Sequence, residues 1–249
     1  MFRLLKTLPL ILAIAALSII ATGCSNLAQV RVVNAIPDVS ANLDVYVNGS
    51  KAATNLIFQH VYPASTTPVS YVQVASGSDS ITSYKTGTTT SPISDDQSVK
   101  LTASEKYTVV LAGFLQNGPQ TYVFKDDNTA PNQDTGDNKV EFRVINGSAN
   151  TPSNGFDVCI YQTNVTLPTD PTISGLLLGQ SSGYLSFTYE DSYTVLVTTA
   201  GSHCNGTNYV NQSYGQSSST NGQITTLVIV DNSGGSGVSR TPIEMVDLH

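Results

Sequence analysis

The chain has 249 residues, and its 18 acidic side chains outnumber its 11 basic ones, which gives a formal net charge of −7 at pH 7. This length allows one large domain or two ordinary ones and is ample for a hydrophobic core. An acidic chain lacks the basic surface that nucleic-acid binding requires, so we expect no nucleic-acid partner.

Residues 1–23 have the layout of a secretory signal peptide. Arg3 and Lys6 form a basic start, residues 8–21 are an almost unbroken apolar run, and small residues follow it. A transmembrane helix needs roughly 20 apolar residues, and this run is too short. We therefore expect residues 1–23 to be a cleaved signal helix.

Cys24 directly follows these small residues, and the segment resembles a bacterial lipoprotein signal. The resemblance implies that Cys24 carries lipid and becomes the first residue, with residues 24–27 as anchor and short tether. Several acyl chains anchor a protein stably in a membrane. Ser25 favours the outer membrane if the cell has two. Because Ala21 stands where such signals usually carry Leu, a plain signal peptide cleaved elsewhere is the alternative.

Cys159 and Cys204 remain as a pair once Cys24 is assigned to lipid. An oxidising compartment favours a disulfide between them. Closing a loop of about 45 residues contributes on the order of 4 kcal/mol in the chain-entropy model. A metal site is the alternative, because His203 is next to Cys204, but His60 and His249 are distant in sequence. We expect no metal and no cofactor.

One pattern occurs twice, about 112 residues apart. The matching segments are 30–35 with 142–147, 43–47 with 156–160, 71–74 with 184–187, and 122–126 with 243–247. The pattern predicts two copies of one domain, at residues 28–125 and 139–249. Each copy has the size of a small sandwich.

Short runs rich in Val, Ile, Thr, Tyr and Phe alternate with clusters of Gly, Ser, Asn, Asp and Pro after the signal, which is typical of strands and turns. The most apolar runs, 106–112, 193–197 and 223–230, are predicted to be central strands with both faces buried. The predicted fold class is all-β, with two tandem antiparallel β-sandwiches of immunoglobulin-like or transthyretin-like type.

Residues 126–138 have no periodicity and no large apolar side chain, so they predict a linker between the copies. Their Asp and Asn oxygens are ligands that calcium prefers, which makes a calcium site the alternative. The ligand spacing of an EF-hand is missing.

Arg31 and Arg143 occupy equivalent positions in apolar strands, and Asp44 and Asp157 occupy equivalent positions on the strands that follow. The recurrence predicts one Arg–Asp ion pair within each copy. A ligand-binding Arg is the functional alternative. On the structural interpretation, Arg143→Ala should destabilise the second copy.

No recognisable catalytic arrangement is present, and none of the three histidines has a nucleophile-elbow or protease context. A glycosidase would use paired carboxylates. The pairs at 95–96, 126–127 and 190–191 fall in turn-like stretches, which favours solvated loops.

Sugar binding is another candidate, because aromatic side chains commonly form stacking platforms. The chain has no Trp, but four tyrosines gather in the second copy near the long polar stretch 201–222: Tyr189, Tyr193, Tyr209 and Tyr214. Long loops are often functional. A mobile polar loop held by Cys204 is the simpler interpretation.

The openings Arg31-Val32-Val33-Asn34-Ala35-Ile36-Pro37-Asp38 and Leu43-Asp44-Val45-Tyr46-Val47-Asn48-Gly49 resemble the bacterial extracellular family known as domain of unknown function 4397. The resemblance is looser in the second copy, where Cys159 replaces the Tyr. It implies a β-sandwich exported to the cell surface or periplasm, and it implies no activity.

These observations predict a non-catalytic, lipid-anchored protein of the cell envelope that serves in binding, adhesion or envelope organisation, with an unknown protein or glycan partner. An accessory subunit that docks another envelope protein through a sheet edge is one alternative. A hydrolase with an unrecognised site is another. The short tether predicts that the first copy lies against the membrane, so that cleavage in the linker releases the second copy.

Overall fold

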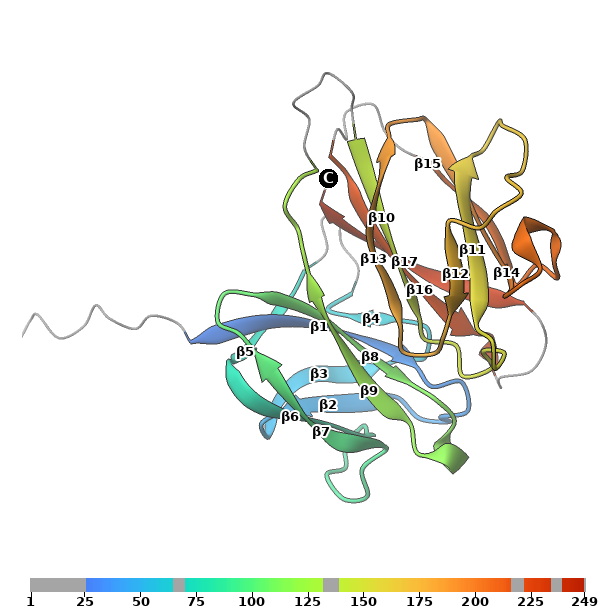
Figure 1. The fold of residues 1–249 in the computed structure, drawn as a ribbon. Coiled ribbons are helices and arrows are strands. Elements are labelled where there is room, and N and C mark those ends of the chain that lie inside the picture. The colour runs from blue at the N-terminus through green and yellow to red at the C-terminus, as the bar shows by residue number, and fades with distance from the viewer. Residues whose placement is uncertain (1–25, 65–69, 132–138, 216–221, 234–238, 249) are drawn as a thin grey trace, which may run out of the picture.

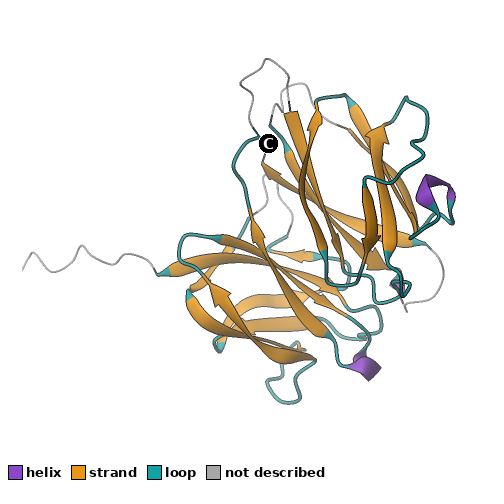
Figure 2. Cartoon of the chain, in the orientation of Figure 1, coloured by secondary structure: helices purple, strands orange, loops and turns teal. Residues whose placement is uncertain are grey.

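The computed structural model describes residues 26–64, 70–131, 139–215, 222–233 and 239–248. The chain forms two β-sandwiches that lie against each other (Figure 1). Strands dominate both of them, and the helical segments are single short turns (Figure 2). The predicted all-β fold with tandem sandwiches is confirmed. The signal segment and Cys24 lie outside the described residues.

The first sandwich contains two sheets, here called A and B. Sheet A has the order β4-β1-β8-β9, with β5 also paired to β1, and sheet B has the order β3-β2-β6-β7. The strands are β1 (Leu27–Ala35), β2 (Leu43–Val47), β3 (Ser50–Leu56), β4 (Val61–Tyr62), β5 (Val72–Ala75), β6 (Gly77–Lys85), β7 (Ser94–Leu101), β8 (Lys106–Ala112) and β9 (Gln120–Asp126). A 3-10 turn, η1 (Leu115–Asn117), precedes β9.

The second sandwich repeats this arrangement in sheets C and D. Sheet C has the order β13-β10-β16-β17, and sheet D has the order β12-β11-β14-β15. The strands are β10 (Lys139–Asn146), β11 (Phe156–Gln162), β12 (Ile173–Leu176), β13 (Ser181–Thr188), β14 (Ser192–Thr199), β15 (Val210–Gly215), β16 (Ile224–Asp231) and β17 (Arg240–Leu248). A second 3-10 turn, η2 (His203–Asn205), follows β14.

Each sandwich contains one parallel pair, which the antiparallel expectation did not include. β1 runs parallel to β8, and β10 runs parallel to β16. Parallel neighbours require a crossover connection, and here the chain passes through the other sheet of the same sandwich before it returns. The remaining paired strands are antiparallel.

The most apolar strands lie in the middle of their sheets, as their sequences predict. In β8, Val109 and Leu111 point into the core of the first sandwich, whereas Val110 and Ala112 point the other way. That second face contacts the other sandwich. The contact explains why β8 and β16 are apolar on both faces.

A third apolar core lies between the two sandwiches, because the outer faces of sheets A and C pack together. Its buried members come from both halves of the chain: Val33, Ala35, Val61, Val110, Ala112, Ile145, Val228, Val230, Ile243 and Met245. Burial of so much apolar surface holds the sandwiches together as one body.

Some predicted boundaries differ from the observed ones. β1 begins at Leu27, within the predicted tether, and Asp126 is the buried last residue of β9 rather than the start of a linker. The pair at 95–96 belongs to β7 rather than to a turn. The polar stretch 201–222 contains η2 and strand β15, so it is not one continuous loop.

Candidate functional site

Four charged side chains meet at the centre of the contact between the sandwiches. Arg31 from β1 contacts Asp247 of β17 (Nη1–Oδ1 2.5 Å) and Asp126 of β9 (Nη2–Oδ2 3.3 Å). Arg143 from β10 contacts Asp126 (Nη2–Oδ1 2.7 Å) and lies 3.9 Å from Asp247. Each carboxylate therefore neutralises an arginine from each half of the chain. We call these four residues the interdomain charge cluster.

Equivalent neighbours surround the two arginines. The Nε atom of Arg31 donates to Thr108 Oγ1 (2.8 Å), and that of Arg143 donates to Thr226 Oγ1 (3.0 Å). The guanidinium groups lie over tyrosine rings at 5.2 Å from Tyr71 and 4.6 Å from Tyr184. These paired contacts give the contact between the sandwiches an approximate two-fold symmetry.

The opposite charges favour the ionised forms of Arg31 and Asp126. Burial alone would lower the pKa of Arg31, but Asp126 and Asp247 outweigh that effect and raise it. Burial likewise would raise the pKa of Asp126, but Arg31 and Arg143 hold it below its usual value. The charges sum to zero and the side chains are fully buried, so the cluster fixes the two sandwiches rather than binding a ligand.

The predicted pairing of each arginine with an aspartate of the following strand is wrong. Asp44 accepts hydrogen bonds from the backbone N–H groups of Asn55 (2.9 Å) and Gly87 (3.3 Å), and it pairs with Lys51. Asp157 is the equivalent residue in the second sandwich, where its carboxylate accepts from the backbone of two glycines. These aspartates join neighbouring turns of sheets B and D, whereas the arginines point away from those sheets.

The signal for the true partners was present in the repeat. Asp126 and Asp247 end the matching segments 122–126 and 243–247, and Tyr71 and Tyr184 begin another matching pair. Charged residues at the same position of two apolar strands indicate a shared structural role. The sequence did not show that the role lies between the sandwiches.

The predicted disulfide between Cys159 and Cys204 is confirmed, with a Cα–Cα distance of 6.1 Å. The disulfide holds η2 against sheet D.

A pocket of about 440 Å³ lies next to η2. In it, His203 Nδ1 is 3.6 Å from Asp170 Oδ1, and both side chains are largely exposed. The lining residues are Asp157, Asp170, Pro171, Ser174, Gly175, Ala200, Gly201 and His203.

The four tyrosines of the second sandwich do not form a sugar platform. Tyr193 and Tyr214 are members of its apolar core, and Tyr189 and Tyr209 pack against that core. The rings of Tyr193 and Tyr214 fill the interior of the sandwich, and those of Tyr189 and Tyr209 are half-buried against it. This interpretation of the tyrosine cluster is therefore wrong.

The remaining candidate residues are the histidines and the possible metal ligands. His60 is exposed, with its Nδ1 atom 2.8 Å from the carbonyl oxygen of Phe58, and His249 is outside the described ranges. In the part of the chain that the structure describes, no three His, Cys, Asp or Glu side chains gather closely enough to hold a metal ion. The calcium alternative falls largely on residues 132–138, which are not described. None of the described helical segments has the length and apolar character needed to cross a bilayer.

The fold and the cluster define a two-sandwich β-protein whose halves are locked by a buried charge network. Residues 28–158 match the family described as domain of unknown function (DUF4397), and the chain belongs to this family. The match includes the first sandwich, β10 and the start of β11. No curated protein matches the chain in sequence.

Solved structures show only distant similarity. One describes α-glucan recognition by family 41 carbohydrate-binding modules from streptococcal virulence factors, with 11% identity, 84% of this chain and 95% of that chain covered, and a TM-score of 0.27. Another describes α-glucan binding by a streptococcal virulence factor, with 10% identity, the same coverage and a TM-score of 0.25. The Bacillus anthracis TIE protein has 11% identity, with 84% of this chain and 34% of that chain covered, and a TM-score of 0.22. At these TM-scores the similarity assigns no function to this chain.

Proposed function

We propose that this chain is a non-catalytic, lipid-anchored binding module of the cell envelope, built from two copies of the family's domain. The observation that carries the proposal is the interlocking of the two sandwiches through the interdomain charge cluster and the shared apolar core. Such a contact makes the chain a rigid body rather than two domains on a flexible linker.

The internal symmetry supports the two copies. Each sandwich has the same strand order, the same parallel pair, and an arginine held by a threonine and a tyrosine at the same positions. Unrelated sandwiches would share the layers without sharing these side-chain contacts.

The position of Cys24 supports the anchor. Only Ser25 and Asn26 separate it from Leu27, the first residue of β1, so the lipid would lie within about 10 Å of the fold. β1 begins on the opposite side of the molecule from η2 (Figure 1). A rigid body anchored in this way holds the far end of the second sandwich away from the membrane. The buried disulfide accords with export to an oxidising compartment.

The buried charges support a non-catalytic role. The buried arginines pair with buried aspartates, as in the cluster and in the Arg240–Asp231 contact (2.8 Å). They have no route to a substrate because their side chains have almost no exposed surface. Buried ion pairs of this kind serve the structure rather than a reaction.

Membrane fractionation tests the anchor. The full-length chain should label with palmitate and sediment with membranes, in the outer membrane if the cell has two, and Cys24→Ser should abolish labelling and release the protein. An unlabelled wild-type chain, or a Cys24→Ser chain that still sediments, would contradict the anchor. A pull-down from detergent-solubilised membranes then tests binding: one stoichiometric protein partner would favour an accessory subunit over a glycan-binding or adhesion role.

A further inference from the structure

The outer faces of sheets B and D differ at equivalent positions. In sheet D, Cys159 lies opposite Leu196, and both are buried together with Thr198. The cover is η2, which the disulfide to Cys204 holds in place, and Thr198 Oγ1 donates to the carbonyl oxygen of His203 (2.6 Å). The second sandwich therefore closes this face with its own chain.

The same positions in sheet B are open. Tyr46 lies opposite Thr82, as Cys159 lies opposite Leu196, and Tyr84 takes the place of Thr198. All three side chains are half-buried rather than buried, so no described segment covers them as η2 covers sheet D. The rings of Tyr46 and Tyr84 pack edge to face at 5.7 Å.

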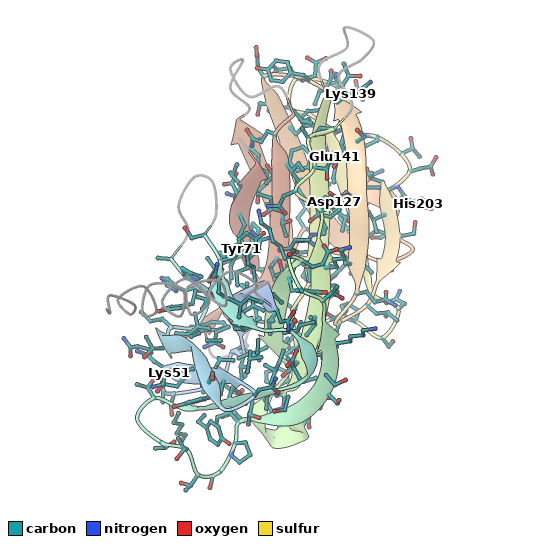
Figure 3. The ribbon with its side chains drawn as sticks, turned by 90° about the vertical axis from the view of Figure 1, so that its left-hand side faces the viewer. Lys51, Tyr71, Asp127, Lys139, Glu141 and His203 are labelled. Atoms are coloured by element: carbon teal, nitrogen blue, oxygen red, sulfur yellow. A yellow bond between two sulfur atoms is a disulfide. The ribbon has the colours of Figure 1, made fainter. Side chains whose placement is uncertain are left out.

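A charged pair borders the two rings. Lys51 Nζ lies 5.4 Å from the ring centroid of Tyr46 and 2.7 Å from Asp44 Oδ2, and 43% of its side chain is exposed. Figure 3 shows Lys51 at the outer surface of the first sandwich. Asp44 is fixed from beneath by the backbone of Asn55 and Gly87. This end of the face is therefore preorganised.

Hydroxyl groups extend the face across the sheet. Side chains alternate between the two faces along a strand, and residues paired across an antiparallel sheet point to the same face. Tyr84 and Thr82 therefore identify which positions of β6 and β7 point outward. These positions carry short polar side chains and one lysine: Ser78, Ser80, Ser98 and Lys100. We call Tyr46, Tyr84, Lys51 and these outward residues the tyrosine face.

We propose that the tyrosine face binds a polysaccharide. In sheet D, apolar residues meet an apolar cover, whereas the tyrosine face combines aromatic rings with hydroxyl and charged groups. A sugar ring has the complementary chemistry, because its C–H surface packs on an aromatic ring while its hydroxyl groups hydrogen-bond. The outward residues include no aliphatic side chain, which is the wrong composition for the apolar core of a protein interface. This inference rests on the proposed binding function and names its site.

Co-sedimentation with insoluble polysaccharides tests the proposal. The full chain in detergent is mixed with starch, cellulose, chitin or peptidoglycan, and the bound fraction is measured. We expect retention on at least one of them, and we expect Tyr46→Ala and Tyr84→Ala each to weaken it about tenfold. Tyr161→Ala is the matched control, because Tyr161 lies on the corresponding part of sheet D beside the disulfide, where it packs against Cys159 and Cys204. Thermal unfolding checks that each variant is folded.

Each other outcome overturns the inference in a distinguishable way. Retention that survives both folded tyrosine variants, or that falls equally in Tyr161→Ala, places the glycan site elsewhere and leaves the proposed function intact. Retention on none of the four polysaccharides rejects the glycan ligand. A protein captured from membranes and lost in Tyr46→Ala would replace the glycan by a protein partner. A chain that also fails to label with palmitate would reject the proposed function itself.

Discussion

Each arginine of the interdomain charge cluster depends on partners from both sandwiches. Arg143 donates to Asp126 in the first sandwich and to Thr226 in its own. Removing two such charges from water costs free energy of desolvation. The ion pairs offset this cost only while every partner is present. The cluster therefore favours this contact, because a docking that separated these partners would leave buried charges unpaired.

Arg143→Ala should lower the free energy of unfolding by about 3–5 kcal/mol, because it leaves Asp126 and Asp247 buried with one arginine between them. Chemical denaturation measures the loss, and both sandwiches should be affected. Lys125→Ala is the control, since the Lys125–Glu105 pair is exposed and its loss should not move the midpoint. A second sandwich that unfolds early while the first is unchanged would show that the cluster does not couple them.

Stability should fall in acid. The pKa values of Asp44 and Asp126 lie below the usual 3.8 in the folded chain, so their contribution is complete above that pH and is lost as the pH falls. We expect the free energy of unfolding to decline below about pH 4. Denaturation between pH 7 and 2 measures this, and Asp44→Asn should decline less steeply. Glu141 contributes in the opposite direction: burial raises its pKa, so its contribution to stability increases as the pH falls. A wild-type curve that is flat down to pH 2 would contradict the prediction.

The central strands β8 and β16 show how much structural information an apolar run of sequence carries. β8 and β16 are apolar on both faces, and the sequence correctly predicts their burial. It does not indicate that one of those faces meets another sandwich, because a strand buried within one domain has the same composition. The linker boundary failed for a related reason: Asp126 looks like a loop residue until its arginine partners are known.

The η2 turn and its disulfide are an element whose removal should be measurable. Replacing both Cys159 and Cys204 by Ser should cost on the order of 4 kcal/mol, because the disulfide closes a loop across 45 residues of sequence. Denaturation of the double variant measures this, and the wild-type chain under reducing conditions should match it. A double variant as stable as the oxidised wild type would show that the cover on sheet D holds without the bond.

The two sandwiches also contact each other through backbone groups and turns. The Gln59 side chain donates to the carbonyl oxygen of Asp231 (2.8 Å), and the backbone N–H of Asp127 donates to the hydroxyl of Tyr184 (3.1 Å). Gly179 has φ +75° and lies so close to the Tyr122 ring that a Cβ would clash with it. These contacts change the expectation that cleavage of the linker frees the second sandwich.

A protease site placed within residues 132–138 tests this directly. After cleavage the two halves should elute together in size-exclusion chromatography, because the shared apolar core and the cluster remain. The same cleavage in an Arg143→Ala chain should allow the halves to separate more readily. Separation of the cleaved wild-type halves under native conditions would contradict the interlocked arrangement.

The strand content and the pairing of Cys159 with Cys204 could be predicted from the sequence alone. Those features follow from local pattern and from a short inventory of cysteines. The tertiary fold sets which charges meet, since Arg31 and Asp247 are 216 residues apart. It also decided that sheet D is covered while the tyrosine face is open. Both outcomes depend on which sheet faces pack together, and a period of two along a strand does not encode that choice.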